Sequence, residues 1–261
     1  MTDTLKDIPV FVAAVEAGSF AQAAIRLHLS RSAVGKSIAQ VSGRLRVAVP
    51  VLFGRQCVAP LLIELAQEHP GLELEMSFSD RVVDLVEEGF DMAVRNGPLQ
   101  DSSVLVARKL GEHRMVLCAA PDYLLKKGLP QSVDDLPHHA AINYLQAGRV
   151  LSWQLMDKEG VSHTFTPRSS LNMDDLQAIC DAALAGHGIA WLPCWMASKE
   201  IHQGKLVPLL KQAPDVRFDV HAVWQQTPHL PLRVRIAVDM LASRLPSVIS
   251  LDMPAPTKKP R

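Results

Sequence analysis

Apolar residues recur every three or four positions over the first forty residues of the chain, a spacing that places them on one face of a helix. Over 4–17 these apolar residues are Leu5, Ile8, Phe11, Val12 and Val15. The spacing continues over 20–27 and 31–40, and Ser19 and Ser30 precede those segments as N-caps. The pattern predicts three short helices, the last two joined by a tight turn as in a helix-turn-helix.

At Gly43 the pattern changes to alternating strands and helices. We expect strands at 44–49, 72–78, 91–95, 104–110, 115–119, 140–144, 153–156, 169–172, 188–192 and 216–224. We expect helices at 58–68, 80–88, 121–127, 174–185, 193–203 and 232–245. Strands that alternate with helices in this way predict an α/β fold, with parallel sheets covered by helices.

The strands and helices fall into two groups, and the long strand at 216–224 is predicted to return to the first group. A chain that leaves one lobe and later returns to it creates a cleft between two lobes. The expected boundaries are 1–41 for the all-α segment, 42–250 for the two-lobed domain (lobe one about 44–112 and 222–248, lobe two about 113–221) and 251–261 for a tail. The tail is rich in Pro and Lys and is predicted to be disordered.

The charge of the chain is unevenly distributed. The 261 residues have a net charge of zero, but residues 1–46 contain six Lys and Arg against three Asp and Glu. The first 46 residues therefore carry +3 and the remainder carries −3. A basic segment in front of an acidic body suits a DNA-binding segment joined to a sensing domain. A charge of this size also arises by chance, so charge alone does not decide between the two interpretations.

Cysteine spacing excludes two kinds of site. Cys57, Cys118, Cys180 and Cys194 are far apart, so neither a zinc site nor a disulfide framework is supported. We expect buried free thiols, as is usual in a reducing cytosol. A redox-sensing thiol is the alternative, and Cys57 near Arg55 has the clearest basic neighbourhood.

The chain lacks the motifs of catalysis and of membrane insertion. It has no G-x-S-x-G elbow, phosphate loop or metal triad, so we expect no enzyme activity, no catalytic residue, no metal and no cofactor. It has no signal peptide pattern and no apolar run of about 18 residues. We therefore expect a cytoplasmic protein without a membrane partner.

Several motifs carry a family resemblance. The amino-terminal ones are Phe11-Val12-x-x-Val15-Glu16-x-Gly18-Ser19-Phe20-x-x-Ala23-Ala24 and Leu27-x-Leu29-Ser30-Arg31-Ser32-Ala33-Val34. The later ones are Val41-Ser42-Gly43-Arg44-Leu45-Arg46-Val47, Glu88-Gly89-Phe90-Asp91-Met92-Ala93-Val94-Arg95 and Ala185-Gly186-His187-Gly188-Ile189-Ala190-Trp191-Leu192-Pro193. Together they resemble the LysR-type transcriptional regulators over nearly the whole chain.

The resemblance implies a winged-helix DNA-binding domain followed by a periplasmic-binding-protein-like effector domain in two lobes. Members of the family bind promoter DNA as dimers or tetramers, and a small inducer in the cleft changes how they bind the DNA. We therefore expect promoter DNA and a small-molecule effector as partners, and a homo-oligomer formed through the effector domains.

The resemblance also implies which residues contact DNA. They are Ser19, Phe20, Arg31, Ser32 and Lys36. Hydroxyl groups and helix amino termini bind phosphates, while Arg and Lys reach guanine edges, so the residue types agree with this role. The alternative is a solvated helix face on a segment too small to fold alone.

The effector site is predicted at the carboxyl ends of the strands, where α/β sheets bind ligands. The residues expected to line it are Pro50, Val51, Phe53, Asn96, Ser103, Asn143 and Asn172. Each Asn or Ser taken alone is more commonly a turn or cap residue. A helix that begins near Asp174 offers backbone amides to an anion, whereas Asp174 and Asp175 repel one. The charge of the effector therefore stays open.

The chain departs from the family layout after Gln40. Family members continue from the recognition helix into a wing and a long linker helix, and about fifty residues of this kind are absent here. Two hypotheses follow. The chain is either a ligand-responsive regulator in which the deletion impairs DNA binding, or a stand-alone effector-binding protein without autonomous DNA binding.

Overall fold

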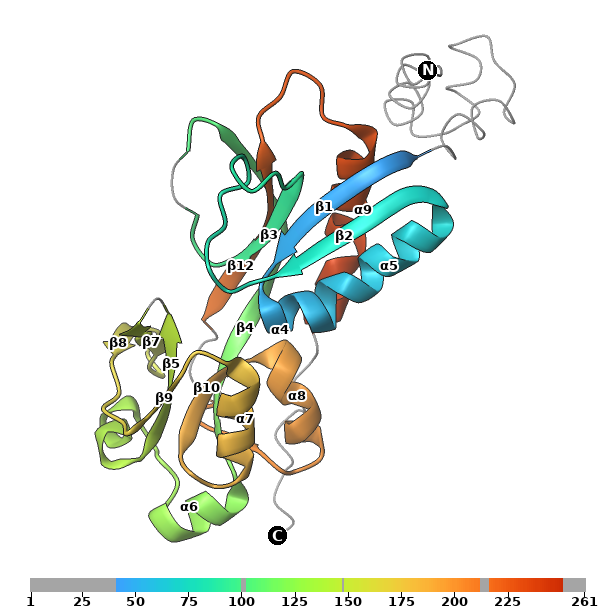
Figure 1. Ribbon diagram of the computed structural model, residues 1–261. Coiled ribbons are helices and arrows are strands. Elements are labelled where there is room, and N and C mark those ends of the chain that lie inside the picture. Colours follow the sequence, from blue (N-terminus) through green and yellow to red (C-terminus); the bar gives the residue numbers. More distant parts are fainter. Residues whose placement is uncertain (1–40, 100–101, 147, 212–215, 251–261) are drawn as a thin grey trace, which may run out of the picture.

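The computed structural model describes residues 41–99, 102–146, 148–211 and 216–250. The three helices expected over 1–40 lie outside the described residues, together with the DNA contacts assigned to Ser19, Phe20, Arg31, Ser32 and Lys36. The tail 251–261 also lies outside them. The described chain forms an elongated α/β structure of two lobes (Figure 1).

Lobe one contains the first three strands and the strand that returns to them. Its strands are β1 (Ser42–Val49), β2 (Gly71–Phe78), β3 (Met92–Asn96), β12 (Arg217–Gln225) and the first part of β4 (Leu105–Ala119). Its helices are α4 (Val51–Phe53), a π-helical turn (Gly54–Val58), α5 (Ala59–Glu68) and α9 (Leu232–Ile249). β12 pairs with β3 and β4, so the predicted return of 216–224 to lobe one is confirmed.

Lobe two contains the rest of β4 and the strands that follow it. They are β5 (Ala141–Gln146), β6 (Arg149–Val150), β9 (Leu171–Met173), β10 (Ile189–Pro193), β11 (Val207–Pro208) and a separate hairpin of β7 (Trp153–Met156) and β8 (Ser162–Phe165). The helices are α6 (Pro121–Lys127), a 3-10 turn (Val133–His138), α7 (Leu176–Leu184) and α8 (Cys194–His202). The sequence pattern did not predict β6, β8 or β11, which are two to four residues long.

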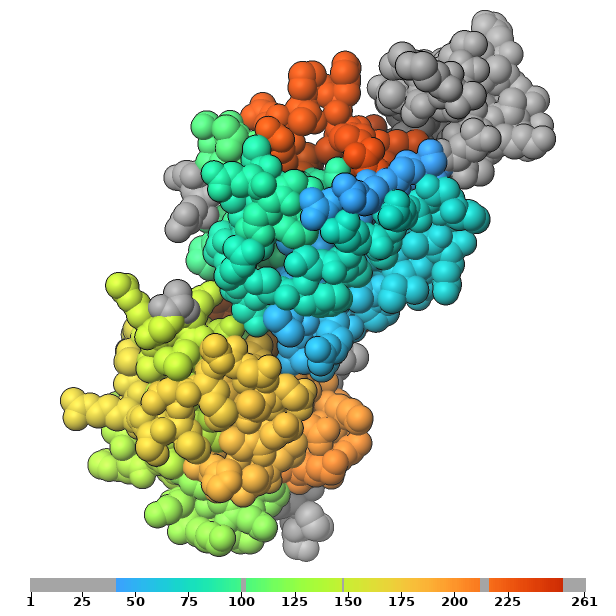
Figure 2. Space-filling model, in the orientation of Figure 1, coloured from blue at the N-terminus to red at the C-terminus, as the bar shows by residue number. Residues whose placement is uncertain are grey.

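One sheet runs through both lobes, in the strand order β2-β1-β3-β12-β4-β10-β5-β6. β1 lies parallel to β2 and β3 in lobe one, and β5 lies parallel to β9 and β10 in lobe two. The two strands between these groups, β12 and β4, are antiparallel to their neighbours. Each lobe therefore presents parallel strand ends towards the region between the lobes, and Figure 2 shows the surface narrowing there.

β4 is a single strand where the sequence pattern predicted two, at 104–110 and 115–119. Leu105–Arg114 pairs with β12, and Met115–Cys118 pairs with β10. The residues between the two predicted segments also have partners, because Gly111 pairs with Val220. The prediction was wrong because the hydrophobic alternation is interrupted there, while the backbone ladder continues.

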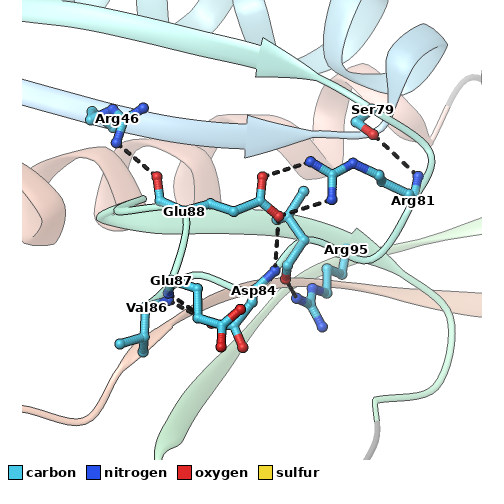
Figure 3. Close-up of polar contacts among 9 residues, drawn as sticks. Arg46, Ser79, Arg81, Asp84, Val86, Glu87, Glu88 and Arg95 are labelled. Atoms are coloured by element: carbon cyan, nitrogen blue, oxygen red, sulfur yellow. Dashed lines mark hydrogen bonds and ion pairs between the residues drawn. The ribbon is translucent and has the colours of Figure 1, made fainter.

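The helix predicted over 80–88 is also wrong, since that segment forms turns. The Asp84 carboxylate accepts hydrogen bonds from the backbone N–H groups of Val86 (2.9 Å) and Glu87 (3.0 Å) (Figure 3). A short carboxylate that binds the amides two and three residues ahead competes with helical hydrogen bonding. Asp80 as a cap and Gly89 after the last residue predicted the helix, but the segment instead forms turns with buried Val83 and Leu85.

Side chains from β1 and from the turn itself hold this segment in place. Arg46 donates hydrogen bonds to the carbonyl oxygens of Glu88 (2.9 Å) and Gly89 (2.7 Å), and also to the Glu75 carboxylate (3.0 Å). Arg81 forms a two-point contact with the Glu88 carboxylate at 3.0 and 2.7 Å (Figure 3). Gly89 has φ +70°, a backbone conformation that favours glycine.

The cores of the two lobes join in one apolar cluster. It includes Leu45 and Leu62 from lobe one, and Ile179 and Leu192 from lobe two. Within this cluster the α4 side chain of Phe53 packs against Trp195 of α8, with ring centroids 5.4 Å apart and an angle of 70°. Burial of a side chain such as Phe contributes about 1.5–3 kcal/mol, so contacts of this kind stabilise the junction between the lobes.

Candidate functional site

Polar side chains from both lobes approach one another between the lobes. Asp80 follows β2 in lobe one, while Tyr144 belongs to β5 in lobe two. Asp174 and Asp175 follow β9, also in lobe two. Asp80 interacts electrostatically with both of those carboxylates, and all three act on Tyr144. We call these four residues the interlobe group.

The surroundings of the interlobe group raise the pKa of two of its residues, Asp80 and Tyr144. Burial raises the pKa of Asp80 above its usual range, and the charges of Asp175 and Asp174 raise it further. A hydrogen bond from Val51 opposes this shift. Burial and the three carboxylates raise the pKa of Tyr144 to about 12. Tyr144 is therefore a hydrogen-bond donor near neutral pH, in a region of negative potential.

The first helical turn of lobe one faces this group. Pro50 precedes α4 as its N-cap, and the backbone N–H of Val51 donates a hydrogen bond to Asp80 Oδ1 at 3.0 Å. The amide at this helix start is therefore occupied by a carboxylate of the same chain. Phe53, two residues later, is turned into the core and is only 2% exposed.

The structure brings Asn143 and Asn172 together. They pair in register between β5 and β9, and Asn143 Nδ2 donates to Asn172 Oδ1 at 2.9 Å. Asn143 Nδ2 also donates to the Pro167 carbonyl oxygen at 3.1 Å, and Asn172 Nδ2 donates to that of Ser169 at 3.2 Å. Asn143 is 1% exposed and is fixed by these bonds, whereas Asn172 is exposed.

Asn96 and Ser103 lie elsewhere in lobe one. Asn96 ends β3, is exposed, and pairs with Val220 of β12. Ser103 is exposed in the bend before β4. Among the described residues, hydrogen bonds join Asn143 to Asn172 and Val51 to Asp80, but they do not join the seven predicted residues into one network. Their assignment to an effector site stays a prediction.

The sequence reasoning missed two members of the interlobe group. The sequence pattern predicts Asp80 at the start of the helix 80–88 and Tyr144 at the end of the strand 140–144, with no function for either. The signal that identifies both is their place at or near the carboxyl end of a parallel strand, next to residues already chosen on that ground.

The four cysteines are free and buried, as expected. Burial raises the pKa of Cys57 to about 12 and that of Cys180, with help from Asp181 and Glu200, to about 11. Burial also raises the pKa of Cys118 above its usual range. Since the thiolate is the reactive form, these environments oppose a redox-sensing role, including one for Cys57.

The described residues contain neither a cluster for a metal ion nor a helix for a membrane span. No three His, Cys, Asp or Glu side chains in the described ranges are arranged to hold a metal ion. None of the helices in those ranges is both long and apolar enough to cross a membrane.

Comparison with known families gives two matches. The family described as "LysR substrate binding domain" matches residues 39–246, and the family described as "Bacterial regulatory helix-turn-helix protein, lysR family" matches residues 5–59. The matches overlap over 39–59. The structure places Ser42–Val49 in the sheet of lobe one, so the first match describes the overlapping residues better.

Individual proteins show the same similarity. An uncharacterized HTH-type transcriptional regulator of Haemophilus influenzae is 33% identical over 203 residues, which cover 78% of this chain and 70% of that protein. The HTH-type transcriptional regulator CrgA of Neisseria meningitidis is 27% identical, covering 94% of this chain and 98% of that protein. The solved structure of CrgA, a LysR-type transcriptional regulator, has a TM-score of 0.69 and 24% identity over 94% of this chain and 99% of that chain.

The CrgA alignment also bears on the length of this chain. It extends over 299 positions, 38 more than the 261 residues present here. At least that many positions of the alignment therefore have no counterpart in this chain.

Proposed function

This chain belongs to the LysR family of bacterial transcriptional regulators, and from that membership we propose that it binds a small effector between its two lobes. The observation that carries the proposal is the interlobe group, which joins side chains of both lobes at or near the carboxyl ends of β2, β5 and β9. A ligand bound there contacts both lobes at once, so it changes the free energy of their closure. The seven predicted site residues, among them the exposed Asn172, belong to this proposal.

The charge of the interlobe group favours one class of effector. Three carboxylates and a protonated Tyr144 attract a cation or a neutral hydrogen-bonding molecule, and they repel a simple carboxylate. The α4 amide of Val51, which would otherwise bind an anion, already bonds Asp80. We propose a cationic or neutral polar effector.

Three probes of equal chain length test this charge preference: 1,4-diaminobutane, 1,4-butanediol and butanedioate. The expected result is a rise in Tm with the diamine that exceeds the rise with the diol, and no rise with the dicarboxylate. Asp174→Asn is expected to reduce the effect of the diamine. Glu159→Gln, in an exposed turn, is the charge-matched control and is expected to leave it unchanged. Equal responses to the diamine and the dicarboxylate would contradict the proposed charge preference.

DNA binding is the second part of the proposed function. The helix-turn-helix match over residues 5–59 supports contact with promoter DNA through Ser19, Phe20, Arg31, Ser32 and Lys36. We propose that this contact with DNA is weakened because the wing and the linker helix are missing. A mobility shift on the chain's own promoter, measured at two salt concentrations, tests it, because phosphate contacts release counterions and weaken with salt. A version with a relative's wing and linker helix restored is expected to bind more tightly.

The second candidate function is a stand-alone effector-binding protein. Two observations favour it. The first strand of lobe one, β1, already begins at Ser42, and at least 38 positions of the CrgA alignment have no counterpart in this chain. If the chain gives no shift at low salt while the restored version does, this candidate replaces the first. In either case we propose a non-enzymatic, cytoplasmic protein that forms homo-oligomers through its effector domains. The two relatives named above are transcriptional regulators, which supports this proposal.

A further inference from the structure

His113 lies where β4 passes from one lobe to the other. β4 pairs with β12 of lobe one up to Arg114, and with β10 of lobe two from Met115 onwards. His113 lies two residues before Met115, where the partner changes, and it is only 5% exposed. Any change in the angle between the lobes must therefore act on the backbone next to this buried imidazole.

The imidazole is part of a series of rings that links the two lobes. It stacks on Phe218 of β12 (centroids 6.0 Å apart, 25° between planes) and lies 6.4 Å from Phe53 of α4. Phe53 in turn packs on Trp195 of α8, and Phe218 packs edge-on against Trp191 of β10 at 5.7 Å. His113 therefore contacts the rings of Phe53 and Phe218 of lobe one, and each of these packs on a tryptophan of lobe two.

The polar atoms of His113 are poorly satisfied. Nδ1 is 3.5 Å from the carbonyl oxygen of Arg114, which is the outer limit for a hydrogen bond. Nε2 is buried, and within the described part of the chain it has no hydrogen-bond partner. Burial lowers the pKa of His113 below its usual range, and the Arg114 carbonyl only partly opposes this. Near neutral pH the ring is therefore uncharged.

The neighbouring elements supply little to stabilise a charged imidazole. α4 and β10 contain no titratable side chain. On β4 the Glu112 carboxylate binds Arg217 and Lys109, and on β12 Asp219 binds Lys109 at 2.7 Å. β4 also carries Arg114 directly after His113, and β12 also carries His221. The π-helical turn adds the exposed Arg55, and α8 adds Cys194, Lys199, Glu200 and His202.

We propose that His113 makes the junction between the lobes sensitive to pH: the neutral ring completes the aromatic packing, and the protonated ring weakens it. The sign follows from linkage, because a histidine that is neutral when buried must bind a proton more readily in the unfolded or opened state. Its stabilising effect is present above the unfolded pKa of about 6.5 and is lost as pH falls below that value. Acidification therefore favours a looser junction. This pH sensitivity lies at the junction between the lobes and does not depend on which effector binds.

Two variants of the full chain distinguish the effect of His113 on the pH dependence of stability from the effects of other titrating groups. His113→Phe keeps a ring in the same space but cannot titrate, and His229→Gln changes an exposed histidine as the matched control. Thermal unfolding is monitored by tryptophan fluorescence, and Tm is measured at several pH values between about pH 8 and about pH 5. Wild type and H229Q are expected to lose about 2–4 °C more than H113F over this range. Equal losses in wild type and H113F would overturn the proposal.

Direct titration gives an independent test. The histidine resonance missing from the NMR spectrum of H113F identifies His113, and it is expected to titrate below about pH 6.5. A midpoint at or above that value would overturn the proposal. If H113F does not fold, small-angle scattering of the wild type is expected to show a larger radius of gyration at about pH 5 than at about pH 8, and an unchanged radius would count against it. Neither measurement uses effector or DNA, so failure here is distinct from failure of the proposed function.

Discussion

At the scale of single residues, the contacts of Arg46 and Asp80 are set by segments that lie far away in the sequence. In the sequence Arg46 is one basic residue of a strand. In the structure it contacts β2 and the turn that follows it, and its guanidinium lies 5.0 Å from the ring centroid of Phe90. Asp80 was expected to start a helix, and instead it accepts a hydrogen bond from Val51, which begins another helix. Both roles depend on residues far away in sequence.

Arg46→Ala is expected to destabilise the chain by about 2 kcal/mol, because it leaves the carbonyl oxygens of Glu88 and Gly89 without their donor. Urea unfolding measures this change. Arg44→Ala is the matched control, since its guanidinium is 3.6 Å from Glu75 and its side chain is 57% exposed. The control is expected to change stability by less than about 0.5 kcal/mol. Equal effects would show that the contacts of Arg46 to the turn contribute nothing.

Asp80→Asn is expected to stabilise the chain at neutral pH, because it keeps an oxygen for the Val51 N–H and removes a charge that burial disfavours. The raised pKa means that the folded state holds the Asp80 proton more tightly than the unfolded state. The wild type therefore recovers stability as pH falls through the raised pKa towards the usual value of about 3.9, and D80N lacks this recovery. Urea unfolding at neutral and acidic pH measures both. A D80N protein less stable than wild type at neutral pH would refute this account.

At the scale of elements, β4 and the segment after β2 show that partners can override a local pattern. Asp80 and Gly89 are placed as a helix start and end over 80–88, but Asp84 and Arg46 satisfy the amides and carbonyls of this segment in other ways. β4 extends across an interrupted pattern because β12 pairs with the intervening residues. By contrast, α7 forms where it was predicted, since Asp175 caps it by accepting from Ala178 N–H at 2.8 Å, a strictly local contact.

The exposed edge of lobe one leads to a prediction about oligomers. β2 ends the sheet, and Ile63 on the adjoining α5 is 49% exposed. If the effector domains associate through this edge, Ile63→Lys is expected to weaken the dimer at least tenfold in Kd, as loss of a central apolar contact does. Light scattering after size exclusion measures this. Leu125→Lys, at an 84% exposed position in lobe two, is the matched control. Unchanged mass for I63K would place the interface elsewhere.

At the scale of the whole molecule, the lobes are connected by packing as well as by two chain crossings. The apolar cluster contains residues of both lobes, and Phe53 and Trp195 meet within it. A joint core favours unfolding of the two lobes together, and β4 runs from one lobe into the other. This arrangement suits a ligand-responsive domain.

The fragment 42–250 is therefore expected to unfold in one cooperative transition, with coincident far-ultraviolet circular dichroism and tryptophan fluorescence. Phe53→Ala is expected to lower its stability by about 3–5 kcal/mol, the usual cost of removing a buried Phe. The exposed Val82→Ala, 75% exposed, is the control and is expected to stay within about 0.5 kcal/mol. Two separate transitions in the unmutated fragment would show that the lobes are independent.

The sequence by itself determined the family, the α/β class and most helices and strands, because apolar periodicity and caps are local properties. It also placed Asn143 and Asn172 in one predicted site, since both lie on neighbouring parallel strands. Only the tertiary structure decided that Asp80 meets the carboxylates of the other lobe and that β4 is continuous. It also decided that His113 packs on two rings, Phe53 and Phe218, that in turn contact tryptophans of the other lobe. These contacts join residues far apart in sequence, and a side chain's hydrogen bonds, charge and burial depend on which partners the folded chain brings to it.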